Sequence, residues 1–136
     1  DCSPEGFQWI NNISANENML VFLRKAEEET LLVVCNFSPL VYEKHKLGVP
    51  FEGRYKEIFN SDHEQFGGSD VRNKRVKTSK KSECDGFEDS IEITVPPMGV
   101  AVFTCTEEKL PVKKKKSEAK KPAAKTTVKK GRAKKA

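Results

Sequence analysis

The 136 residues are enough for one domain, and their charges divide the chain into two parts. Residues 1–108 hold 12 Lys and Arg against 19 Asp and Glu, a net charge of −7, whereas residues 109–136 hold 13 against one, a net charge of +12. No apolar run approaches the length of a transmembrane helix and no signal peptide is recognisable. We therefore expect no membrane association and predict a cytoplasmic location.

The large apolar residues fall almost entirely within residues 1–108. After that point only Leu110, Val112 and Val128 are larger aliphatic residues than alanine, and they cannot offset the entropy lost on ordering the segment. The composition predicts a folded domain over residues 1–108 and a disordered Lys/Ala-rich tail over residues 109–136.

Apolar and polar residues alternate over much of the first part with the period of a β-strand. Strands are predicted at residues 18–25, 30–37, 41–49, 53–60, 90–95 and 98–106, and a turn near residues 4–8. The nearly continuous apolar run at 30–37 predicts a central strand covered on both faces. The polar stretch 61–86 is expected to be functional, mobile or to contain a short strand around Val76. The sequence thus predicts an all-β fold, an antiparallel β-sandwich of Greek-key type with about seven to eight strands.

No residue pattern indicates catalysis, a cofactor or a metal. The carboxylate pairs Asp62 with Glu64 and Glu88 with Asp89 lie in polar stretches without apolar neighbours that would raise a pKa, so we interpret them as solvated. The two histidines have no ligands at metal-binding spacing. The four cysteines lack a CxxC spacing and are expected to be reduced thiols; they are Cys2, Cys35, Cys84 and Cys105.

The Lys-rich tail is the strongest compositional signal in the chain. Lysines interleaved with Ala, Pro and Thr, without aromatic residues, would bind polyanions such as nucleic acids through counterion release. The candidate contacts are Lys113, Lys114, Lys115, Lys116, Lys129 and Lys130. The alternative is a solubilising extension that contacts nothing specific.

Several phrases of the first part, in order, carry a family resemblance. They are residues 4–10 (PEGFQWI), 19–25 (MLVFLRK), 31–39 (LLVVCNFSP), 47–50 (LGVP), 53–62 (GRYKEIFNSD), 66–69 (FGGS) and 94–103 (TVPPMGVAVF). Together they resemble the C-terminal domain of bacterial 1,4-α-glucan (glycogen) branching enzymes of the α-amylase superfamily. Two segments depart from the family: residues 71–88 are more basic, and the tail is not a general family feature.

The resemblance implies a parent chain with a catalytic (β/α)8 barrel that cleaves an α-1,4-glucan and transfers it to form α-1,6 branches in glycogen biosynthesis. It implies that the three catalytic carboxylates of this glycosyltransferase lie upstream, so none is assigned here. The C-terminal β-sandwich would pack on the barrel, and alone it would be inactive. Under this hypothesis Phe7, Trp9 and Ile10 form an exposed apolar patch that contacts the barrel or glucan.

Two other hypotheses belong to different classes. The chain would be a polyanion-binding protein if its tail dominated its behaviour. It would be a free-standing carbohydrate-binding module if exposed aromatic rings converged on one surface, and the candidates for such a surface are Trp9, Tyr42 and Tyr55.

Overall fold

The computed structural model describes residues 3–11 and 18–109. The described part contains nine strands and two short 3-10 helices: η1 (Pro4–Gly6), β1 (Phe7–Asn11), β2 (Met19–Lys25), β3 (Thr30–Asn36), β4 (Tyr42–Val49), β5 (Gly53–Asn60), η2 (Glu64–Phe66), β6 (Lys77–Thr78), β7 (Lys80–Cys84), β8 (Phe87–Val95) and β9 (Gly99–Glu107). Residues 110–136 of the tail, with the six candidate lysines, lie outside the described residues.

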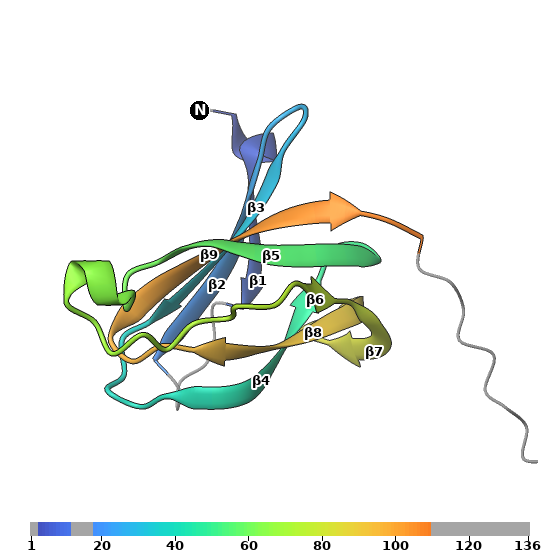
Figure 1. Ribbon diagram of the computed structural model, residues 1–136. Coiled ribbons are helices and arrows are strands. Elements are labelled where there is room, and N and C mark those ends of the chain that lie inside the picture. Colours follow the sequence, from blue (N-terminus) through green and yellow to red (C-terminus); the bar gives the residue numbers. More distant parts are fainter. Residues whose placement is uncertain (1–2, 12–17, 110–136) are drawn as a thin grey trace, which may run out of the picture.

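The strands form two antiparallel sheets (Figure 1). The large sheet has the order β1-β2-β3-β9-β5-β6, and the small sheet has the order β4-β8-β7. The chain leaves the large sheet after β3, returns to it with β5, and crosses between the sheets again before β7 and β9. This order confirms the predicted all-β, antiparallel two-sheet fold. The long polar stretch contains η2 and two short strands, β6 and β7, of which β6 directly follows Val76 as predicted.

The core lies between the two sheets because alternate residues of each strand point inward. In β2 the inward residues Met19, Val21 and Leu23 are at most 3% exposed. They pack with inward residues of the neighbouring strands and of the small sheet; the other core residues are Ile10, Leu32, Val34, Leu47, Val49, Tyr55, Ile91, Ile93, Val95, Ala101 and Phe103. The predicted strands therefore meet in one hydrophobic core.

Strand β3 is central in the large sheet, but it is covered on one face only. Leu32 and Val34 are fully buried between the sheets, whereas Leu31, Val33 and Cys35 on the opposite face are partly exposed. The described part of the chain provides no layer over that second face. The prediction of a strand covered on both faces is therefore wrong for this chain by itself.

Candidate docking surface

The side of the large sheet that faces away from the small sheet is mostly apolar. Cross-strand register places its residues, because directly paired residues of antiparallel strands point to the same side. We call this surface the outer face. It consists of Phe7 and Trp9 on β1, Leu20, Phe22 and Arg24 on β2, Leu31, Val33 and Cys35 on β3, Val100, Val102, Thr104 and Thr106 on β9, Arg54, Lys56 and Phe59 on β5, and Thr78 on β6.

One row of apolar residues crosses five adjacent strands of the outer face. Trp9 pairs with Phe22, Phe22 with Val33, Val33 with Val102, and Val102 with Phe59. With neighbouring strands about 4.8 Å apart, this row is about 19 Å long. Its two ends, Trp9 and Phe59, are 45% and 44% exposed. The row therefore presents an apolar strip that no described residue covers.

Three aromatic rings form a cluster at the β1 end of the strip. The centroids of Phe7 and Trp9 lie 5.0 Å apart, those of Phe7 and Phe22 5.2 Å, and those of Trp9 and Phe22 5.9 Å. The guanidinium carbon of Arg24 lies 6.0 Å from the Phe7 centroid. Such contacts fix the rings relative to one another, so the cluster is a preformed surface.

The predicted patch of Phe7, Trp9 and Ile10 is only partly brought together. Phe7 and Trp9 point to the outer face, but Ile10 is 7% exposed and belongs to the core. A break in the β1–β2 register between Trp9 and Asn11 accompanies this inward placement. Ile10 is therefore not available for docking. The sequence analysis missed most of the surface, which continues through β2, β3, β9 and β5.

The corresponding face of the small sheet is charged. Lys46 pairs with Glu92 across β4 and β8, and both are exposed, while their neighbours Leu47 and Ile91 point into the core. The Lys46 Nζ also donates to Ser82 Oγ at 2.6 Å. Charged side chains suit a face in contact with water, whereas an apolar face of this size marks a contact surface. The two outward faces of the sandwich therefore differ in chemical character.

The three aromatic residues considered for a carbohydrate platform do not converge. Tyr55 is fully buried in the core, where its hydroxyl donates to the Phe51 carbonyl at 2.7 Å. Desolvation, followed by the nearby Cys105, raises the Tyr55 pKa. Tyr42 belongs to the small sheet and Trp9 to the large one. These positions contradict the surface that a carbohydrate-binding module was predicted to have.

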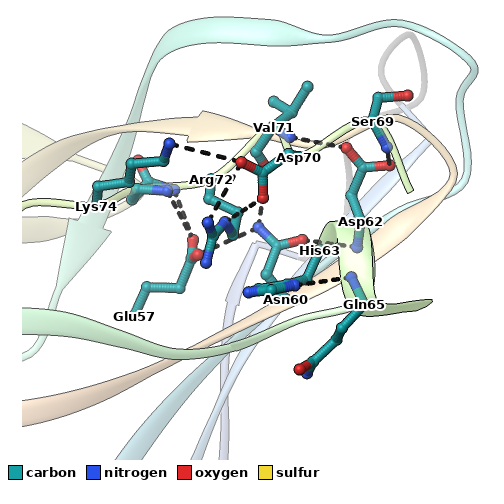
Figure 2. Close-up of polar contacts among 11 residues, drawn as sticks. Glu57, Asn60, Asp62, His63, Gln65, Ser69, Asp70, Val71, Arg72 and Lys74 are labelled. Atoms are coloured by element: carbon teal, nitrogen blue, oxygen red, sulfur yellow. Dashed lines mark hydrogen bonds and ion pairs between the residues drawn. The ribbon is translucent and has the colours of Figure 1, made fainter. Parts of the chain in front are cut away.

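One carboxylate of each candidate acid/base pair, Asp62 or Asp89, makes other contacts in the structure. The Asp62 carboxylate accepts from the backbone N–H groups of Ser69 at 3.1 Å and Val71 at 2.9 Å, which closes the loop after β5 (Figure 2). Asp89 pairs with Lys81 at 3.1 Å. Within residues 3–11 and 18–109, no three His, Cys, Asp or Glu side chains form a cluster that could hold a metal ion.

Among the described residues, no helix is long and apolar enough to cross a membrane.

Residues 9–106 match the family described as alpha amylase, C-terminal all-beta domain. The match covers more than half of the chain, so the chain belongs to this family. Its two-sheet fold agrees with that class, and the sequence resemblance to branching-enzyme C-terminal domains is confirmed.

Curated relatives define the type of parent protein more closely. The chain is 42% identical over 105 residues to the 1,4-alpha-glucan branching enzyme GlgB of Prochlorococcus marinus (strain MIT 9515), covering 76% of this chain and 14% of the relative. It is 40% identical over 130 residues to the enzyme of the same name from Bacillus cereus (strain Q1), covering 94% of this chain and 19% of the relative. The enzyme from Oceanobacillus iheyensis is 42% identical over 105 residues, 76% of this chain and 16% of the relative.

The chain thus spans less than a fifth of the length of these relatives. The Bacillus cereus alignment covers 94% of the chain, which is more than residues 1–108 alone could account for. It therefore includes part of the Lys-rich tail. The alignments with the Prochlorococcus marinus and Oceanobacillus iheyensis relatives cover only 105 residues, so the expectation that the tail is not a general family feature stays a prediction.

Proposed function

We propose that this chain is the C-terminal accessory domain of a glycogen branching enzyme, and that its outer face docks on the catalytic barrel of the parent chain. The parent would cleave α-1,4-glucan and form α-1,6 branches in glycogen biosynthesis, in the cytoplasm. One observation carries the docking proposal: the outer face of the large sheet is apolar, while that of the small sheet is charged.

Burial of the outer face would supply the energy of docking. Each large side chain removed from water contributes on the order of 1.5–3 kcal/mol at full burial, and the strip offers aromatic rings at both ends. A second row of the outer face runs from Phe7 on β1 through Arg24, Leu31 and Thr104 to Lys56 on β5, so it carries two positive charges. A complementary barrel surface would be apolar, with carboxylates facing Arg24 and Lys56.

The role of the domain would be structural. Of the carboxylates considered for acid/base chemistry, Asp62 binds backbone N–H groups and Asp89 binds a lysine, and the outer face carries no acid at its centre. We propose that the parent barrel holds the catalytic residues and binds glucan, and that this chain stabilises the barrel.

A fusion tests the proposal. The chain would replace the matching C-terminal segment of the Bacillus cereus (strain Q1) relative, and Trp9→Ser would be compared with Glu92→Ser. Both residues are exposed, but Glu92 lies on the outward face of the small sheet, where it pairs with Lys46. We expect Trp9→Ser to lower the melting temperature and branching activity of the fusion, measured by the iodine complex of amylose, and Glu92→Ser to leave both unchanged. Equal effects would refute docking through the outer face.

Polyanion binding by the tail is a second candidate function. The +12 net charge of residues 109–136, against −7 for the rest, favours it. Lysines 113–116 and the pair Lys129 and Lys130 are the proposed contacts, and binding would be independent of nucleic-acid sequence. This activity is compatible with the docking role because the two involve different segments.

A further inference from the structure

A second group of exposed apolar side chains lies on the turns at one end of the sandwich. Phe37, Leu40, Phe66 and Met98 are 59%, 60%, 57% and 67% exposed. They come from the β3–β4 turn, the loop after β5 and the β8–β9 turn, which share one end of the molecule (Figure 1). We call these four residues, with Val41 and Phe59, the turn end. They make up six of the nine exposed large hydrophobic residues in the described part of the chain.

Buried polar groups fix the β3–β4 and β8–β9 turns to each other. The Asn36 side chain is 1% exposed and donates to the carbonyls of Leu40 and Pro96, both at 2.9 Å. The backbone N–H of Met98 donates to the Ser38 carbonyl at 2.9 Å. The two turns are therefore one unit.

The loop after β5 is fixed to the same unit. Ser61 donates its backbone N–H to the Val100 carbonyl at 2.9 Å, and Val100 N–H donates to Ser61 Oγ at 2.8 Å. Within this loop the Asp62 carboxylate holds the backbone of Ser69 and Val71 (Figure 2). The Phe66 ring lies 5.8 Å from the Phe59 ring, centroid to centroid, so the loop joins the turn end to the outer face.

Two further properties argue that the turn end is a contact surface. Residues 37–41 and 95–103 contain no charged side chain, although turns in contact with water are usually polar. Met98 has a φ of +44°, a left-handed conformation that favours glycine, yet it carries the most exposed large apolar side chain of the described residues. Backbone strain and exposure at one residue indicate a role outside the domain core.

We infer that the turn end is a second contact region for the catalytic part of the parent chain. This inference rests on the proposed function, because it assigns the same partner. Continuity supports that occupant, since Phe59 belongs to both surfaces, and the chain spans only 14–19% of its relatives. The uncharged β3–β4 and β8–β9 turns fit an apolar protein surface better than a polyanion or a sugar. The catalytic part of the parent chain thus contacts both the outer face and the turn end of the sandwich, which meet at Phe59.

Oxidation of methionine by hydrogen peroxide tests this inference directly. The chain has two methionines, Met98 at 67% exposure and Met19 at 3%. In the isolated chain Met98 should oxidise rapidly and Met19 slowly. In the fusion with the Bacillus cereus catalytic part, we expect Met98 oxidation to slow at least fivefold. Radical footprinting of Trp9 in the same samples reports the outer face, and the partly exposed Cys84 on the small sheet serves as the control that stays accessible.

The outcomes separate the two proposals. Protection of Trp9 without protection of Met98 would overturn the turn-end inference alone. Protection of neither would overturn the proposed function as well. Slower Met98 oxidation in the isolated chain on adding maltoheptaose, or on raising the protein concentration, would instead assign the turn end to glucan or to a second copy.

A substitution gives an independent test. Met98→Gly removes the side chain and relieves the left-handed backbone, so the isolated chain should stay folded with an unchanged or higher melting temperature. In the fusion the same substitution should lower the melting temperature of the catalytic part. No change in the fusion would contradict a contact at Met98.

Discussion

The Asn73 side chain makes two hydrogen bonds with the backbone of Thr94, as the backbone of a neighbouring strand would. Its Nδ2 donates to the Thr94 carbonyl at 2.7 Å, and its Oδ1 accepts from the Thr94 N–H at 2.8 Å. The Glu57 carboxylate on β5 accepts from both nitrogens of Asn73. One side chain thus connects β8 of the small sheet with β5 of the large sheet.

Replacing this residue should therefore destabilise the sandwich. Asn73→Ala would leave the Thr94 backbone and part of the Glu57 carboxylate without partners in a site where Asn73 is 7% exposed. We expect the free energy of unfolding to fall by about 2–3 kcal/mol, measured by urea denaturation of the isolated chain. Gln65→Ala, at an exposed loop position, should change it by less than about 0.5 kcal/mol. Similar losses of unfolding free energy in Asn73→Ala and Gln65→Ala would refute the role of Asn73 in connecting the two sheets.

The loop around Asp70 should have a distinct acid titration. The Arg72 side chain hydrogen-bonds the Asp70 carboxylate and lowers its pKa, with a smaller contribution from Lys74. A lowered folded-state pKa stabilises the fold above the unfolded pKa of about 3.9, and this contribution is lost as the pH falls through the folded-state pKa. Carboxyl NMR should show Arg72→Gln raising the pKa of Asp70 more than Lys74→Gln does. An unchanged titration in Arg72→Gln would contradict the pairing.

Gly48 should not tolerate a side chain. A Cβ atom at this position would lie 2.3 Å from the Cys84 carbonyl oxygen and 2.9 Å from Phe87 Cδ2. Because the backbone of the β7–β8 hairpin would have to move, we expect Gly48→Ala to cost about 2–3 kcal/mol in urea denaturation. Gly86→Ala meets no atom but has a φ of +79°, so it should cost only about 1 kcal/mol. A larger loss of unfolding free energy in Gly86→Ala than in Gly48→Ala would contradict the close packing at Gly48.

The tail proposal predicts a steep salt dependence. If lysines 113–116 each neutralise a phosphate of duplex DNA, their replacement by Gln should reduce the slope of log K against log salt by up to about 3.6. Truncation after Glu108 should abolish DNA binding while leaving the melting temperature of residues 1–108 unchanged. DNA binding by the truncated chain would show that the tail is not the contact.

Much of the fold could be predicted because the strands alternate clearly. The observed β2, β3 and β4 begin or end within one residue of the predicted ranges, and β5 coincides with its prediction. Strand β8 begins three residues earlier than predicted, because the β7–β8 hairpin turns at Asp85 and Gly86, both with positive φ. The turn there is a tight one, and the sequence analysis did not recognise it.

The outer face was harder to predict for a physical reason. In residues 19–23 every side chain is apolar, so alternation does not tell which side faces the core. The pairing of Trp9 with Phe22 and of Val33 with Val102 depends on register between distant segments. The same holds for Asn73, whose partners lie 16 and 21 residues away along the chain. The available signal was that residues on both faces of the strand are apolar, which is typical of a strand covered on both sides; the described residues cover only one of them.

Two cysteines, Cys35 and Cys84, lie on different sheets, so their reactivity can report whether the outer face is in contact with a partner. Cys35 lies on the outer face, whereas Cys84 lies on the small sheet, and both are partly exposed free thiols. Burial raises the pKa of the Cys35 thiol, and it is also the largest cause of the raised pKa of Cys84, so both should alkylate slowly. Contact with a partner would shield one thiol and spare the other. The ratio of the two alkylation rates would therefore measure, without any introduced label, what fraction of the domains is docked.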